Sequence, residues 1–207
     1  MTLQNRVLPT GEIVAVAGRG LFTGNRGILH GPGRQLGVAR WRHPHWIICA
    51  LAFKGRRREV MAPGRWTELF FLDEAVALAA GHRPCAECRR ERFLAFQSAW
   101  AEACGTHPSA PQMDAALHGA RVLPRTRRQI RHDAPWASLP DGAFVWSDDA
   151  AWLVLGDRLC RYSPQGYDAT ASRPGSGLAE VLTPAPTVSV LRAGYRAQVH
   201  PTARPQA

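Results

Sequence analysis

Two cysteines separated by two residues are the most specific chemical feature of this sequence. Cys85 and Cys88 lie in the run RPCAEC at residues 83–88. This spacing allows both sulfurs to reach one zinc ion, at about 2.3 Å each. The sequence predicts that a helix starts at about Cys85, and the exposed N–H groups of a helix start stabilise thiolate, the form that binds metal. We therefore predict a zinc site that includes Cys85 and Cys88.

The same spacing also occurs in thioredoxin-like redox pairs and in pairs of unrelated core cysteines. A redox pair follows a strand in a βαβ unit, whereas a predicted short helix and Gly81 precede Cys85 here. The chain has five cysteines and no signal-peptide pattern at its start, which argues against a disulfide framework. These features favour metal binding, and we assign Cys104 and Cys160 to the core.

The charge balance of the chain is strongly basic. Its formal net charge of +10 favours anionic partners, of which nucleic acid is the commonest. Because Lys54 is the only lysine, a GC-rich genome is the competing explanation for the excess of arginine. Two clusters of basic residues are candidates for phosphate contacts: Lys54, Arg56, Arg57 and Arg58, and then Arg125, Arg127, Arg128 and Arg131. We predict nucleic acid, with DNA favoured, as the partner.

The sequence also predicts where the protein resides. No stretch reaches the roughly 18 to 20 apolar residues that a membrane helix needs. Together with the absence of a signal-peptide pattern, this predicts a cytoplasmic protein with no membrane partner.

Hydrophobic patterning predicts a fold of short strands and helices, in the α+β or α/β class. Asp73 is expected to cap a helix that Gly81 ends. Strands are expected at 12–17, 46–53, 58–61, 67–72, 142–146, 151–155 and 158–162. Helices are expected at 74–80, 85–103 and 113–120, with a polar loop at 169–177 and a last strand or short helix at 187–191.

Composition divides the chain into four expected parts. A zinc-bearing core of strands and two to three helices is expected over residues 1–120. An arginine-rich connector at 121–140 leads to a small antiparallel β unit at 141–200. Residues 201–207 are expected to form a disordered tail.

The segment around the cysteine pair resembles a known family. Residues 70–90, FFLDEAVALAAGHRPCAECRR, resemble the metal-binding domain of the Ada DNA-repair protein. The likeness is close over these residues and looser over 41–92. The resemblance implies a zinc ion held by four cysteines, one of which accepts a methyl group from DNA phosphotriesters.

The resemblance also implies the remaining ligands. Cys85 and Cys88 match the second cysteine pair of that family, and Cys49 is the upstream cysteine that can match the first. His45, four residues before Cys49, resembles the histidine that replaces a cysteine in related zinc modules. Phe53 stands where the family has its second early cysteine. We therefore expect Cys49 and His45 to complete the site, and a role in DNA repair.

Three other functions remain open at this stage. A zinc deaminase shares the Pro-Cys-x-x-Cys half of its signature with this chain, but it needs His-x-Glu or Cys-x-Glu upstream, and Cys49 is followed by Ala50 and Leu51. A nuclease would need a histidine-metal site, for which Asn25, His30, Glu68 and His118 are candidates. A zinc-stabilised protein-interaction module is the third alternative. Since three or four thiol or imidazole ligands close a site, we expect the zinc to be structural.

Overall fold

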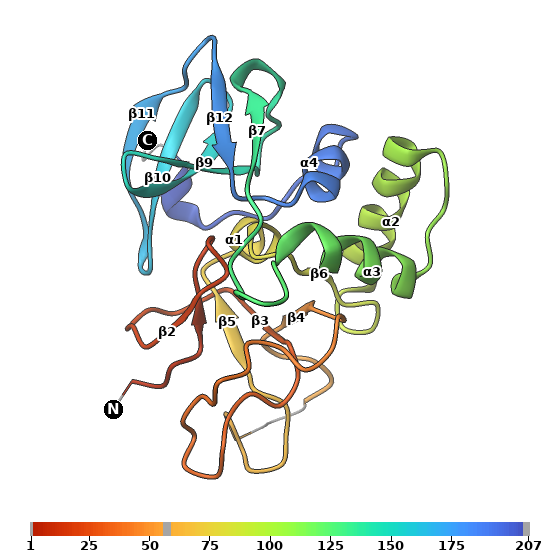
Figure 1. Ribbon diagram of the computed structural model, residues 1–207, viewed down its shortest axis with the longest axis vertical. Coiled ribbons are helices and arrows are strands. Elements are labelled where there is room, and N and C mark those ends of the chain that lie inside the picture. The colour runs from red at the N-terminus through yellow and green to blue at the C-terminus, as the bar shows by residue number, and fades with distance from the viewer. Residues whose placement is uncertain (1, 56–58, 205–207) are drawn as a thin grey trace.

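The computed structural model describes residues 2–55 and 59–204 (Figure 1). This part of the chain contains four α-helices and two six-stranded sheets, so the fold is α+β, as predicted. The expected strands at 12–17, 46–53 and 67–72 are shorter than predicted, and the described part of the expected strand at 58–61 forms turns. Among the described residues, none of the helices has the length and apolar character that crossing a membrane requires.

The first sheet gathers strands from the N-terminal part of the chain. Its strands are β1 (Arg6–Val7), β2 (Ile13–Val14), β3 (Phe22–Asn25), β4 (Ile47–Ala50), β5 (Leu69–Phe71) and β6 (Arg83–Pro84). They lie in the order β2-β1-β5-β3-β4-β6. The β1–β5 and β4–β6 pairs are parallel and the others antiparallel. The parallel pairing of β4 with β6 is what later brings the cysteines together.

Helix α1 (Glu74–Ala79) is fully buried between the two sheets (Figure 1). Asp73 caps it as predicted, because its Oδ1 accepts the Val76 N–H at 2.9 Å. Gly81 follows the helix with φ of +83°, a conformation that a residue with a Cβ adopts only with strain.

The helix after the cysteine pair begins later than predicted. Helix α2 (Arg90–Cys104) starts two residues beyond Cys88, and residues 86–89 form a turn. The expectation that the cysteines occupy the helix start is therefore wrong. Helix α3 (Ala110–Arg121) follows, with a capping box between Ser109 and Gln112.

The second sheet is antiparallel throughout. Its strands are β7 (His132–Pro135), β8 (Phe144–Ser147), β9 (Ala150–Leu155), β10 (Arg158–Ser163), β11 (Gly166–Ser172) and β12 (Leu178–Val181). They lie in the order β11-β10-β9-β8-β12-β7, so β7 belongs to this sheet although it falls within the expected connector. The expected polar loop at 169–177 is partly strand, because β11 is an edge strand whose polar side chains face solvent.

The chain ends by packing back onto α1. Helix α4 (Ala185–Arg192) replaces the expected strand or short helix at 187–191. The one-turn helix η2 (Pro201–Ala203) buries Ala203, which differs from the disordered tail expected from residue 201. A second 3₁₀ turn, η1 (Trp136–Ser138), follows β7.

Buried polar contacts tie the second sheet and the C-terminal segment to α1. The Tyr167 hydroxyl donates to Asp73 at 2.8 Å, and the Tyr195 hydroxyl donates to Glu74 at 2.5 Å. One apolar cluster includes Phe71 of the first sheet together with Phe144 of the second. The two sheets therefore share a core, which fixes the positions of the residues that meet between them.

Candidate functional site

Three cysteines converge at one edge of the first sheet. Cys49 lies on β4, Cys85 directly follows β6, and Cys88 lies in the turn before α2. Their sulfurs all lie within 4.8 Å of one another. Tetrahedral zinc with Zn–S bonds of about 2.3 Å separates its sulfur ligands by about 3.8 Å. The thiol donors and their spacing fit a metal ion of this kind.

The local strand pairing explains this convergence. In the parallel register, Ile47 stands beside Arg83 and Ile48 beside Pro84, so the next pair is Cys49 and Cys85. The Cys85 N–H donates to the Ile48 carbonyl at 2.9 Å and extends the pairing to the ligand itself. The turn that follows brings Cys88 back toward both sulfurs. Two of the three predicted cysteine ligands are thus separated by 36 positions in sequence but adjacent in the sheet.

The protonation of the three thiols is coupled. Hydrogen bonds from Cys49 and Cys88 lower the pKa of Cys85, and the Glu87 N–H also donates to the Cys85 sulfur at 3.4 Å. Hydrogen bonding to Cys85 and Cys88, together with burial, raises the pKa of Cys49. Three thiolates this close repel one another, so full ionisation of the group calls for a cation.

His45 does not join the cysteines, so the prediction that it is the fourth ligand is wrong. Its Nδ1 lies 2.8 Å from Oδ2 of buried Asp114, which also accepts two hydrogen bonds from Arg83. His45 lies before β4 begins at Ile47, and its ring is hydrogen-bonded to Asp114 instead of joining the three sulfurs. Within the described residues, the three cysteines are the one group of metal-type ligands.

A cavity of about 430 Å³ lies against the cysteine group. All three cysteines line it, together with Asn25 and Glu68. Glu68 is buried, and its Oε2 accepts the Met61 N–H at 2.7 Å. A metal ion on the three sulfurs would therefore stand beside a space large enough for a small ligand, with a carboxylate in its wall.

The histidines considered for a nuclease site lie elsewhere. His30 is buried with Nδ1 at 2.6 Å from the Thr67 hydroxyl. His118 lies 3.0 Å from an Arg121 nitrogen, and its ring packs edge-on against Trp41. Neither histidine belongs to the cysteine group, so the two do not assemble a metal site with Asn25 and Glu68.

The predicted basic residues separate into different environments. Arg127, Arg128 and Arg131 line a second cavity of about 930 Å³, whereas Arg125 is exposed and does not line it. Lys54 is exposed on a loop of the first half, and Arg56, Arg57 and Arg58 lie outside the described residues.

Arg121, at the start of the predicted arginine-rich stretch, lines the same cavity, as do Arg26 and Arg40, which the sequence did not indicate. Arg26 lies in the run Gly-Asn-Arg-Gly, which is typical of a turn. Nothing in the local sequence marks it as buried. The signal that could have suggested it is its place directly after strand β3, where a side chain can point inward.

Arg26 and Arg121 both pack on one tryptophan. Their guanidinium carbons lie 3.9 Å and 3.7 Å from the centroid of the Trp46 ring, which is itself buried. Arg121 also donates to the carbonyl oxygens of Gly81 and Pro44, each at 2.7 Å. A Cβ on Gly81 would stand 2.4 Å from Cδ of Arg121, so glycine is required here for the arginine to pass.

Comparison of the chain with protein-family models, with curated proteins and with solved structures found no match. The resemblance of residues 70–90 to the Ada metal-binding domain therefore stays a prediction. Phe53, at the position of that family's second early cysteine, lines the cavity beside the sulfurs.

Proposed function

We propose that this chain is a zinc-binding protein that contacts nucleic acid, with DNA favoured. The observation that carries the proposal is the convergence of three cysteine sulfurs within 4.8 Å. Soft thiolate ligands favour zinc over hard cations such as magnesium or calcium. A reducing cytoplasm would keep these thiols free for the metal.

The contact with nucleic acid is supported by charge and its placement. The chain has a net charge of +10, and six arginines line the larger cavity against two glutamates. Arginine is suited to phosphate because its planar guanidinium makes paired hydrogen bonds to two oxygens. The resemblance to the Ada family points in the same direction and motivates a role in DNA repair.

A second candidate is a zinc-dependent hydrolase that acts on nucleic acid. The observation that favours it is the cavity of about 430 Å³ beside the cysteines, with Glu68 in its wall. Three protein ligands with a remaining open position are the usual arrangement of catalytic zinc. Zinc bound there would activate water at neutral pH. Glu68 and Asn25 would then face the bound substrate from the cavity wall.

Metal analysis and binding measurements test the first proposal together. Purified protein should contain about one zinc per chain, and its affinity for a DNA strand should fall steeply as salt rises. A protein that carries no zinc and binds DNA with no salt dependence would contradict it.

The hydrolase is tested separately with zinc-loaded protein and single-stranded or duplex DNA. Cleavage or deamination that disappears in Glu68→Gln, while the zinc content is unchanged, would support it. Intact DNA after long incubation would leave the zinc in a structural role.

A further inference from the structure

The larger cavity contains a buried cation that has no counter-ion among the described residues. Arg26 is 2% exposed. Its Nε donates to His82 at 3.3 Å and its Nη1 to the Gly11 carbonyl at 3.0 Å. Its Nη2 has no hydrogen-bond partner among the described residues, and none of the ion pairs found there involves Arg26. A buried charge is ordinarily paired, because burial removes its hydration.

The neighbours of Arg26 increase its demand for an anion. Burial lowers the pKa of Arg26 well below its ordinary value, and the charges of Arg121 and Arg40 lower it further. Burial, and then the charges of Arg26 and Arg121, lower the pKa of His82, so its ring is neutral and accepts the hydrogen bond from Arg26. Two cations held against Trp46 without a carboxylate in contact make a site for a negative ligand.

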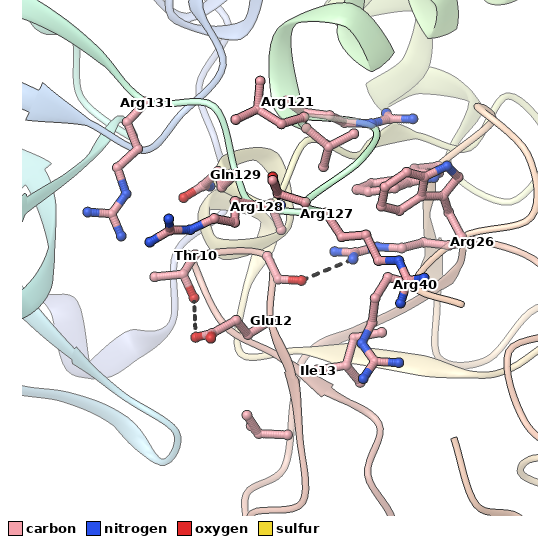
Figure 2. A pocket seen from close by; sticks show the side chains of 18 of the residues that line it. Thr10, Glu12, Ile13, Arg26, Arg40, Arg121, Arg127, Arg128, Gln129 and Arg131 are labelled. Atoms are coloured by element: carbon pink, nitrogen blue, oxygen red, sulfur yellow. Dashed lines mark hydrogen bonds between the residues drawn. The ribbon is translucent and has the colours of Figure 1, made fainter. Parts of the chain in front are cut away.

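The mouth of the cavity adds further positive charge. Figure 2 shows the guanidinium groups of Arg26, Arg40 and Arg127 gathered on one side, while Arg128 and Arg131 extend from the other. Arg131 is partly neutralised by Glu180 at 3.3 Å. Six arginines against two glutamates leave a net charge of +4 on the walls. This excess suits a phosphate group better than a single carboxylate.

The arginines of the mouth are held in place by a glutamine. Nε2 of Gln129 lies 2.8 Å from the Pro9 carbonyl oxygen, 3.1 Å from that of Ala79 and 3.1 Å from that of Leu182. These carbonyls belong to three separate parts of the chain. The loop that presents Arg127 and Arg128 is thereby fixed before a ligand binds, which lowers the entropy lost on binding.

The size and the aromatic walls indicate more than an inorganic ion. A volume of about 930 Å³ lies at the upper end of the range for small-molecule sites, about 300 to 1,000 Å³. The half-buried rings of Trp41 and Trp146 also line the cavity. Arg131 lies over one face of Trp146, and aromatic rings of this kind can stack on a base.

We propose that this cavity binds a nucleotide through its phosphate monoester, with Arg26 and Arg121 at the floor and Arg127 and Arg128 at the mouth. The ligand is a nucleoside monophosphate or the 5′-phosphorylated end of a strand, which share this chemistry. The second source rests on the proposed contact with nucleic acid, whereas the first does not.

Two pairs of probes, each with and without the phosphate, separate the sources. The zinc-loaded protein is titrated with adenosine 5′-monophosphate, and with one short DNA strand carrying either a 5′-phosphate or a 5′-hydroxyl. Charge-assisted hydrogen bonds to a terminal phosphate should make the phosphorylated strand bind at least about tenfold more tightly than the hydroxyl strand. If adenosine 5′-monophosphate binds more tightly than adenosine by a similar factor, the free nucleotide is a ligand.

Matched variants place the phosphate. Arg127→Ala with Arg128→Ala removes two exposed side chains from the mouth and should abolish most of the phosphate-dependent ratio. Arg19→Ala with Arg65→Ala removes the same charge from exposed positions outside the cavity and should leave that ratio unchanged. Circular dichroism confirms that both double variants are folded.

Two outcomes overturn the proposal. In one, neither the strand nor adenosine gains affinity from its phosphate; if salt-dependent DNA binding persists, the proposed function survives without it. In the other, both double variants lower the ratio equally, which places the phosphate outside the cavity. Binding of the mononucleotide alone supports the cavity but contradicts the contact with nucleic acid.

Discussion

The cysteine group and the arginine cavity are two clusters of like groups, and each calls for a counter-ion of the opposite sign. The three thiols become mutually repulsive when they ionise, and they fit a divalent cation. Arg26 and Arg121 lie against one ring with no carboxylate in contact, and they fit an anion. The two sites are therefore related in electrostatic logic but opposite in charge.

They differ in how they are built. The cysteines come from two adjacent strands of one sheet and the turn that follows, so the site depends on a single strand register. The cavity draws on the first sheet, the end of α3 and two strands of the second sheet. Metal binding at the local cysteine site should tolerate substitutions elsewhere, whereas ligand binding in the cavity should weaken whenever the packing between its parts shifts.

The largest effect is expected from Cys85→Ser with Cys88→Ser. Zinc content should fall from about one per chain to near none, as elemental analysis would show. The free energy of unfolding should fall by about 4 kcal/mol when free zinc exceeds its dissociation constant a thousandfold in the native protein. Cys104→Ser, at an exposed position on α2, is the control and should keep its zinc. If the double variant kept its full zinc content, the cysteine group would not be the metal site.

Gly81→Ala should come next, because it strikes the cavity through packing. The new Cβ would meet Arg121 at 2.4 Å from Cδ and would sit at a φ of +83°. We expect a loss of about 2 to 4 kcal/mol and weaker nucleotide binding. Gly105→Ala shares the positive φ but meets no atom within 4 Å, so it should cost only about 1 kcal/mol. Denaturant unfolding measures both, and equal losses would mean that Arg121 simply moves aside.

Arg26→Met tests whether the buried positive charge serves ligand binding and not stability. Removing an unpaired buried cation should leave the stability of the free protein within about 1 kcal/mol of the original or raise it. The same change should weaken nucleotide binding by at least about tenfold, since a charged hydrogen bond is lost. Thermal unfolding with and without adenosine 5′-monophosphate measures both effects. A strongly destabilised variant would show that Arg26 has a structural role, like the role expected of the cysteine ligands.

The smallest effect is expected from His45→Ala. The His45 side chain is 55% exposed, and Asp114 keeps its two bonds to Arg83. Stability should change by at most about 1 kcal/mol, and zinc content should not change. Cys49→Ser, four residues later, should lower zinc affinity markedly. Loss of zinc in His45→Ala would mean that His45 is a zinc ligand and that the three-cysteine site is incomplete.

Sequence patterns were most informative where the chemistry is local. The Cys-x-x-Cys spacing places two sulfurs together whatever the surrounding fold, and the Asp73 cap and the Gly81 stop follow from backbone chemistry. The short strands β1, β3 and β12 could not be predicted as reliably. They have two to four residues each, too few for an alternating pattern to appear.

The fourth ligand shows the limit of spacing taken without conformation. The spacing between His45 and Cys49 would allow both to bind one ion across a turn, but Cys49 lies on β4 and His45 lies before that strand begins. The direction in which a histidine of this kind points is decided by its partner, and here the partner is Asp114, 69 positions away.

By itself, the sequence determined that the fold mixes helices and strands, and it determined the cysteine pair and the basic charge, because composition and short-range spacing carry these properties. Only the tertiary structure decided that Cys49 joins the pair, since a parallel register is a pairing of distant segments. It also decided which arginines share a cavity. Arg26 is a candidate anion-binding residue because it is buried, and its burial depends on residues far along the chain that the local sequence does not contain.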